Sequence, residues 1–247
     1  MIGALTGHVT NAVGVLAADI TVGEHPRATI FGLTVNRDTV ISTFVAGAVL
    51  IGLGLFMVSR ITDGVPGKLQ LAFEGLVRYV EEQVETAMGI KSAPFVVPLA
   101  VTLFAFILIA NWVEIVPTQE KLISPTSDIN LTAALAILVL TWVHLTGFRK
   151  KGLLGYVKSF TGAPRWLIPF RAIEEVAKPL SLALRLFGNL FAGGLMIALI
   201  GLFPSFVLWL PTVIWKLFDM FIGVIQALIF SLLTIVYFSF AVNEEGH

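Results

Sequence analysis

Long apolar runs alternate with short polar stretches along this 247-residue chain. Each run is about 20 residues or longer, and a helix rises 1.5 Å per residue, so each run covers the ~30 Å hydrocarbon core of a bilayer. The pattern predicts about five transmembrane helices, at residues 40–58, 95–114, 129–148, 172–202 and 212–242. The last two are separated by Gly201, Pro204 and Pro211, and we expect them to form a long hairpin.

Two segments do not fit a membrane span. Residues 1–39 carry several charges and form a polar segment ahead of the first span. In residues 68–89, apolar residues recur at helical spacing and charged residues fill the other face, which is typical of an amphipathic helix. Such a helix lies on the membrane surface or against a partner. The alternative is an ordinary surface helix in a soluble hairpin. We expect residues 40–247 to form one membrane domain.

The composition excludes most other classes of protein. Hydrophobic residues make up 57% of the chain and charged residues 13%, about half the usual charged share. A soluble domain of this size cannot bury so much apolar surface, so the sequence predicts an all-α polytopic membrane protein. The net charge is zero, which leaves no basic footprint for nucleic acid. With no cysteine and four scattered histidines, we expect no metal site and no cofactor.

Lysine and arginine are distributed unevenly between the two sides of the predicted spans. With five spans, ten of these residues fall on one side and four on the other. Cytoplasmic loops carry the excess, so we expect the N-terminus outside and the C-terminus in the cytoplasm. The two halves of the chain show no repeat, which argues against an inverted-repeat carrier.

Arg185 lies inside the fourth apolar run, where its permanent charge costs at least ~2.5–3.5 kcal/mol. The nearest acids in the sequence, Glu174 and Glu175, are eleven and ten residues back, roughly 15 Å along a helix. They cannot pair with it on one straight helix, so its partner is water or a carboxylate on another helix or chain. Asn189, at i+4, shares its face. Gly188 helps make this face thin, which suits either close packing or a helix that moves past it.

Asp219 is the charge inside the last predicted span. It lies near the start of the apolar run, and Gln226 follows at i+7 on the same face. Because consecutive spans are antiparallel, Asp219 should lie nearer the outer face of the membrane than Arg185. A carboxylate at that depth can relay protons inward from the outside water. The alternative is that Asp219 caps the start of the helix.

Five further titratable residues are candidates. Glu174 and Glu175 precede the fourth run and form either a hydrated acidic entrance or an interfacial ion cluster. Glu114 and Asp128 bracket the loop between the second and third runs and are candidates for an outer water path. His144 lies shortly before the basic end of the third run and is either an interfacial histidine or a proton carrier.

Three segments carry a resemblance to a known family. Ser181–Asn189, with the sequence SLALRLFGN, closely resembles the signature of subunit a of F-type ATP synthases. The final run from Gln226 to Tyr237 is similar to that family's last helix, and Pro125–Asn130 is similar to the segment before its third span. The resemblance extends over nearly the whole chain from about residue 40.

The resemblance implies a function and partners. It implies a proton-translocating stator subunit without a catalytic site of its own, which offers two offset half-channels to the carboxylates of a rotating ring of c subunits. Arg185 matches the essential arginine between the half-channels, and Asn189 and Gln226 match polar residues beside the path. The implied partners are the c ring, b-type peripheral stalk subunits and membrane lipid, in the plasma membrane of a bacterium.

Two positions depart from the common bacterial pattern. Many relatives carry a glutamate nine residues after the arginine, where this chain has Gly194, and a histidine seven residues before the glutamine, where it has Asp219. The two positions face each other across the predicted hairpin, so one carboxylate replaces a two-residue relay.

Two other function classes fit the residues less well. A stand-alone ion channel or carrier needs internal symmetry or a filter. An intramembrane enzyme needs a nucleophile and a base within reach, or a metal site. The sequence shows no internal symmetry and no filter. The predicted spans also contain no nucleophile paired with a base and no metal site.

Overall fold

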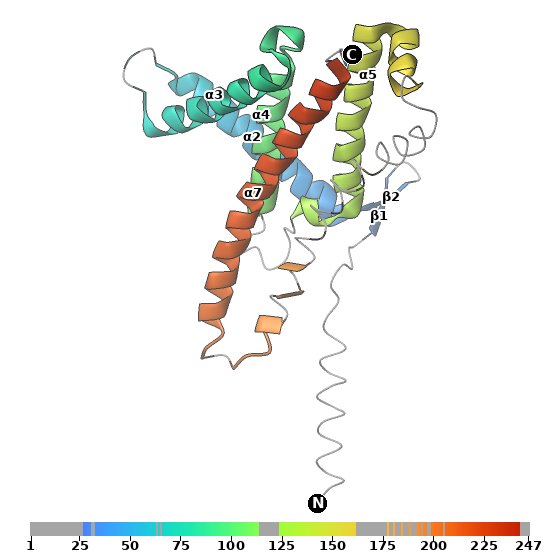
Figure 1. The fold of residues 1–247 in the computed structure, drawn as a ribbon. Helices are drawn as coiled ribbons and strands as arrows, with labels where there is room; N and C mark the ends of the chain where they lie inside the picture. The colour runs from blue at the N-terminus through green and yellow to red at the C-terminus, as the bar shows by residue number, and fades with distance from the viewer. Residues whose placement is uncertain are drawn as a thin grey trace, which may run out of the picture.

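The computed structural model describes residues 27–30, 33–62, 64, 66–113, 124–161 and 206–242, with scattered positions from 177 to 204. A short hairpin is followed by a group of long helices (Figure 1). The elements are β1 (Arg27–Ile30), β2 (Leu33–Asn36), α2 (Arg37–Arg60), α3 (Lys68–Met88), η1 (Ile90–Ser92), α4 (Val96–Trp112), η3 (Pro125–Ser127), α5 (Ile129–Thr161) and α7 (Trp209–Val242).

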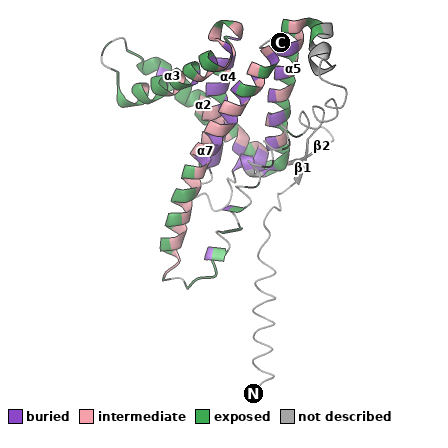
Figure 2. Cartoon of the chain, viewed as in Figure 1, coloured by how far each residue is buried: buried purple, intermediate pink, exposed green. Residues whose placement is uncertain are grey.

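The centre of the described structure is the contact between α4 and α7, with α3 and α5 packed beside them. Buried residues gather along the facing sides of these helices, whereas most of α2 is exposed (Figure 2). Phe95, just before α4, stacks on Trp142 of α5 with ring centroids 5.7 Å apart. The same ring meets Phe238 of α7 edge-on at 5.5 Å. One aromatic side chain therefore joins three helices.

The amphipathic helix predicted at 68–89 is present as α3. Its residues Val80 and Val84 are buried against the core formed with α4 and α7, while the charged side chains of the helix are exposed. Gly89 ends the helix with a φ of 75°, a conformation that glycine adopts readily, and its N–H donates to the carbonyls of Val84 and Glu85. The position of α3 at the membrane surface stays a prediction.

The helix α5 extends beyond the predicted third span. Its apolar part, Ile129–Gly152, includes the basic residues at its end, and the backbone leaves the helical conformation at Gly152, where φ is 70°. The chain then continues as helix to Thr161. The Lys151 ammonium donates to the Phe240 carbonyl at 3.5 Å, so the basic end of α5 lies beside the last turn of α7 (Figure 1). A cation there is favoured by the helix dipole.

The prediction of a helical polytopic membrane protein is confirmed. Within the described residues, α2, the Ile129–Gly152 part of α5, and α7 are long and apolar enough to cross a membrane. The 17 residues of α4 are apolar but give a shorter helix, about 25 Å long. The predicted span at 172–202 lies mostly outside the described residues, so the total of five spans stays a prediction.

The structure differs from the sequence prediction at two further places. The helix α7 begins at Trp209, before Pro211 and not after it. Proline is tolerated there because the first-turn N–H groups of a helix have no partner within the helix. In the predicted polar segment, β1 and β2 form an antiparallel pair with Arg27 opposite Asn36. Four-residue strands rich in β-branched residues suit such a hairpin.

Candidate functional site

A group of buried polar side chains lies where α4, η3 and α7 meet. The Asn111 amide nitrogen donates to the Gly223 carbonyl at 3.2 Å and to the Gln226 side-chain oxygen at 3.3 Å. The Thr126 hydroxyl donates to the Asn111 side-chain oxygen at 2.6 Å and lies 2.7 Å from the Ser124 hydroxyl. We call Asn111, Ser124, Thr126 and Gln226 the amide cluster; each is at most 5% exposed.

The amide cluster depends on a close approach of α4 and α7. A Cβ atom added to Gly223 would lie 3.1 Å from the Cβ of Asn111, which is closer than side-chain carbons normally pack. Beside this contact, the Trp112 indole donates to the Met220 carbonyl at 3.3 Å. On the other side, the Ser124 hydroxyl donates to the Ala110 carbonyl at 3.1 Å. Glycine at 223 therefore allows a polar side chain of α4 to bond directly to the α7 backbone.

Asp219 lies on α7, two turns before Gln226 and on the same face. It is partly exposed and ten residues inside the helix, so it does not cap the helix start at Trp209. A Cβ atom added to Gly193 would lie 3.5 Å from one carboxylate oxygen of Asp219. Gly193, a described residue of the fourth predicted span, therefore lies beside Asp219. Gly194, which the sequence placed opposite Asp219, lies outside the described residues.

The Asp128 carboxylate accepts four hydrogen bonds at the start of α5. One oxygen accepts from the Asn36 amide at 2.7 Å and from the Thr39 hydroxyl at 2.8 Å. The other accepts from the backbone and side-chain nitrogens of Asn130 at 2.9 and 3.0 Å. Asp128 is 5% exposed. This group, which we call the α5 cap, joins the start of α2 to the start of α5 and satisfies an N–H of the first turn.

His144 is partly buried on α5, and its Nδ1 lies 2.9 Å from the Leu140 carbonyl of the same helix. A hydrogen bond there requires the proton on Nδ1. The described residues contain no group of three or more His, Asp or Glu side chains that could hold a metal ion.

The structure thus places four of the nine candidate residues. Gln226 and Asp219 share one face of α7, whereas Asp128 belongs to the α5 cap and His144 lies near the middle of α5. The other candidates lie outside the described residues: Arg185, Asn189, Glu114, Glu174 and Glu175.

Sequence reasoning did not single out Asn111 and Thr126. Asn111 lies near the end of the second apolar run, at residues 95–114. An amide directly inside the end of such a run is a usable signal, because a buried amide requires a hydrogen-bond partner. Its partners, however, are 15 and 115 residues away along the chain, so only the tertiary structure identifies them.

Comparisons with known proteins agree with this architecture. A family model described as ATP synthase A chain matches residues 40–239. The chain is 49% identical over 245 residues to the ATP synthase subunit a of Mycobacterium tuberculosis, covering 94% of this chain and 98% of that protein. It is 47% identical to the subunit of the same name from Acidothermus cellulolyticus, covering 94% and 87%. For the one from Desulforamulus reducens the identity is 36%, covering 88% and 84%. The chain belongs to the ATP synthase A chain family.

Proposed function

We propose that this chain translocates protons through two offset half-channels that meet the carboxylates of a rotating c ring. As a family member, the chain is a membrane subunit of a bacterial F-type ATP synthase and works as part of that complex. The half-channels and the roles of individual residues are our proposal.

The observation that carries the proposal is the position of Asp219. Its carboxylate lies ten residues inside α7, partly exposed, and borders a glycine of the preceding segment. Gln226 follows two turns along the same face and is held by Asn111 in the amide cluster. A titratable group followed by buried amides and hydroxyls is suited to carry a proton into the membrane domain and to orient water along the way. We assign Asp219 to the outer half-channel and Gln226 to its inner end.

The energetics explain why a fixed cation is needed. A rotor carboxylate crosses lipid at low cost when protonated and at high cost when charged, so it ionises only beside water or a compensating cation. Arg185 supplies that cation, with Asn189 on the same face. Because arginine stays charged, it also repels a proton that would pass directly between the half-channels. A proton crossing the membrane releases ~2.3 kcal/mol per 100 mV, and the offset path couples this energy to rotation.

Four of the five remaining candidates belong to the proposed path. Glu174 and Glu175 form the acidic entrance of the inner half-channel. Glu114 and Asp128 border the outer water path at the loop before α5, where Asp128 also holds the α5 cap. His144 lies on α5, apart from the amide cluster, and we assign it no step in the relay.

The proposed orientation places the N-terminus outside and the C-terminus in the cytoplasm, with b-type stalk subunits and the c ring as protein partners. The chain has no cysteine, so single cysteines report accessibility without background. Cysteines introduced at Thr161 and Ser239 should react with an impermeant thiol reagent only from the cytoplasmic side, and one at Thr21 only from outside. The reverse pattern contradicts the orientation.

The central test replaces Arg185 in the assembled complex. Arg185→Ala should abolish ATP-driven proton pumping in reconstituted vesicles. Arg185→Lys should also fail, because a point ammonium lacks the planar fork of arginine and loses its proton more easily. Arg78→Gln, on the exposed face of α3, is the control and should pump like the wild type. Coupled pumping by the Arg185→Ala complex at the wild-type rate would refute the proposal.

A further inference from the structure

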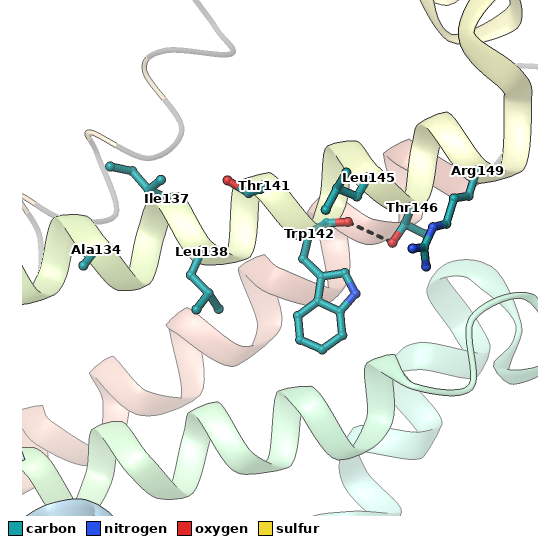
Figure 3. Close-up of a pocket in the computed structure, with 8 residues that line it drawn as sticks. All are labelled: Ala134, Ile137, Leu138, Thr141, Trp142, Leu145, Thr146 and Arg149. Carbon is teal, nitrogen blue, oxygen red and sulfur yellow. Dashed lines mark hydrogen bonds between the residues drawn. The ribbon is translucent and has the colours of Figure 1, made fainter. Parts of the chain in front are cut away.

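One face of α5 carries a groove that the proposed proton path does not use (Figure 3). Its volume is about 780 Å³. Among the described residues, its walls share one helical face: Ala134, Ile137, Leu138, Thr141, Trp142, Leu145, Thr146 and Arg149. Three of the large apolar side chains, Ile137, Leu138 and Leu145, are about half exposed. The groove is therefore mostly apolar, and it lies on a helix that is long enough to span the membrane.

Polar groups are distributed unevenly along the groove. The buried Thr146 hydroxyl donates to the Trp142 carbonyl of its own helix at 2.8 Å (Figure 3), so it requires no partner in the groove. The charge lies at one end, where the exposed Arg149 is a wall residue. Lys150 is also exposed there but does not line the groove. A ligand that fits has a long apolar part and one anionic group.

The length of the groove matches one leaflet of a bilayer. From Ala134 to Arg149 the helix rises about 22 Å. A bilayer including its headgroups is about 40–45 Å thick, so one leaflet is about half of that. A transmembrane helix of a partner would contact α5 through both leaflets, over about 30 Å of hydrocarbon. The groove, by contrast, ends at Ala134, within the apolar part of α5.

We propose that this groove binds one anionic phospholipid of the cytoplasmic leaflet. An acyl chain lies along Leu138, Trp142 and Leu145, and the phosphate is bound by the Arg149 guanidinium. The basic end of α5 belongs at the cytoplasmic face under the positive-inside rule. Basic sites at that level bind acidic headgroups, and the guanidinium fork matches two phosphate oxygens. The proposal does not depend on the half-channels.

The test is photolabelling in the assembled complex. The complex is reconstituted into phosphatidylcholine vesicles containing a small, equal fraction of either phosphatidylglycerol or phosphatidylcholine with a diazirine on the acyl chain. After illumination, labelled positions are mapped by mass spectrometry. Phosphatidylglycerol should label residues 134–146 several times more than phosphatidylcholine. Arg149→Gln should lower this preference about fivefold, as expected for the removal of one cation near an anionic lipid.

Two further variants keep the test decisive. Lys150→Gln removes the same charge one residue away and should change the preference less than twofold. Leu138→Trp fills the groove and should reduce labelling by phosphatidylglycerol even if the Arg149 variant assembles poorly. Equal labelling by the two lipids, or equal effects of the Arg149 and Lys150 variants, would overturn the proposal. So would an absence of lipid labelling combined with crosslinking of a benzophenone at position 138 to another subunit.

Discussion

Asp128 lies directly before the apolar helix α5 and Asp219 lies inside the apolar helix α7, and the surroundings of the two carboxylates differ. Asp128 is 5% exposed, and its carboxylate accepts four hydrogen bonds at 2.7–3.0 Å. Asp219 is partly exposed, and one of its oxygens borders the backbone of Gly193. No described residue donates a hydrogen bond to it.

The comparison indicates which carboxylate is suited to exchange protons. A proton added to Asp128 would displace at least one of its four donors and leave a buried polar group unpaired, which costs ~1–3 kcal/mol. A proton added to Asp219 displaces no donor among the described residues. Asp128 therefore has the geometry of a structural cap, whereas the surroundings of Asp219 fit the relay that we propose.

The largest expected effect is on proton flux after Asp219→Asn. The amide keeps the size of the carboxylate but cannot exchange a proton, so flux in reconstituted vesicles should fall ~100-fold or more. Assembly should be unchanged. Glu82→Gln, an exposed carboxylate of α3, is the control. Flux near the wild-type level in Asp219→Asn would mean that the carboxylate is not a relay.

A second-site change sharpens this test. Asp219→Ala combined with Gly194→Glu should recover part of the flux, because the two positions are expected to face each other at similar depth. Recovery should stay partial, since proton transfer requires about 2.6–3.2 Å or one bridging water. Asp219→Ala combined with Gly193→Glu tests the neighbouring position in the same way, because Gly193 lies beside Asp219. Rescue by neither variant would contradict the pairing of the two segments.

Asp128→Ala should lower the stability of the subunit, in contrast to Asp219→Asn, which should lower proton flux and leave assembly unchanged. It leaves the donors on Asn36, Thr39 and Asn130 without their acceptor, so the free energy of unfolding should fall by about 2–4 kcal/mol. Thermal dissociation of the purified complex measures this loss. Glu81→Ala, on the exposed face of α3, should have no effect. Reduced flux at unchanged stability would instead favour a role for Asp128 in the outer water path alone.

Gly223→Ala should have an intermediate effect on the amide cluster. The new methyl group would lie 3.1 Å from the Asn111 Cβ and push α4 and α7 apart, at a cost of about 1–3 kcal/mol. The bond from Asn111 to Gln226 should weaken with it, which lowers flux as well as stability. Gly52→Ala is the control, since a Cβ there meets no atom within 4 Å. Equal dissociation temperatures for the two variants would show that the helices adjust without cost.

Thr39→Val should give the smallest effect. It keeps the shape of the side chain and removes one of two donors to the same Asp128 oxygen, so we expect a loss of about 1 kcal/mol. Thr43→Val is the matched control, because that hydroxyl bonds only to the Thr39 carbonyl of its own helix. If both variants dissociate at the same temperature, the Thr39 contact adds nothing to the α5 cap.

The sequence by itself determined the helices and the family. Apolar runs of membrane-spanning length specify helices because backbone groups in lipid must bond within their own segment. For this reason α2, α5 and α7 overlap their predicted spans, and the periodicity at 68–89 specifies α3. The motif around Arg185 indicated the family, because a charged residue within an apolar run is rare. The interior charge at Asp219 was visible for the same reason.

The tertiary structure alone decided which polar groups meet. Asn111 and Gln226 are 115 residues apart, and Asn36 and Asp128 are 92 apart, so no local pattern links them. Nor does the sequence distinguish Gly223, which is required for contact, from Gly52, which faces open space. The sequence left open whether Asp219 caps the last helix or lies inside it. Because α7 starts at Trp209, Asp219 lies inside the helix. Periodicity reports which face of a helix is polar, whereas a hydrogen bond requires two atoms about 3 Å apart, and only packing sets that distance.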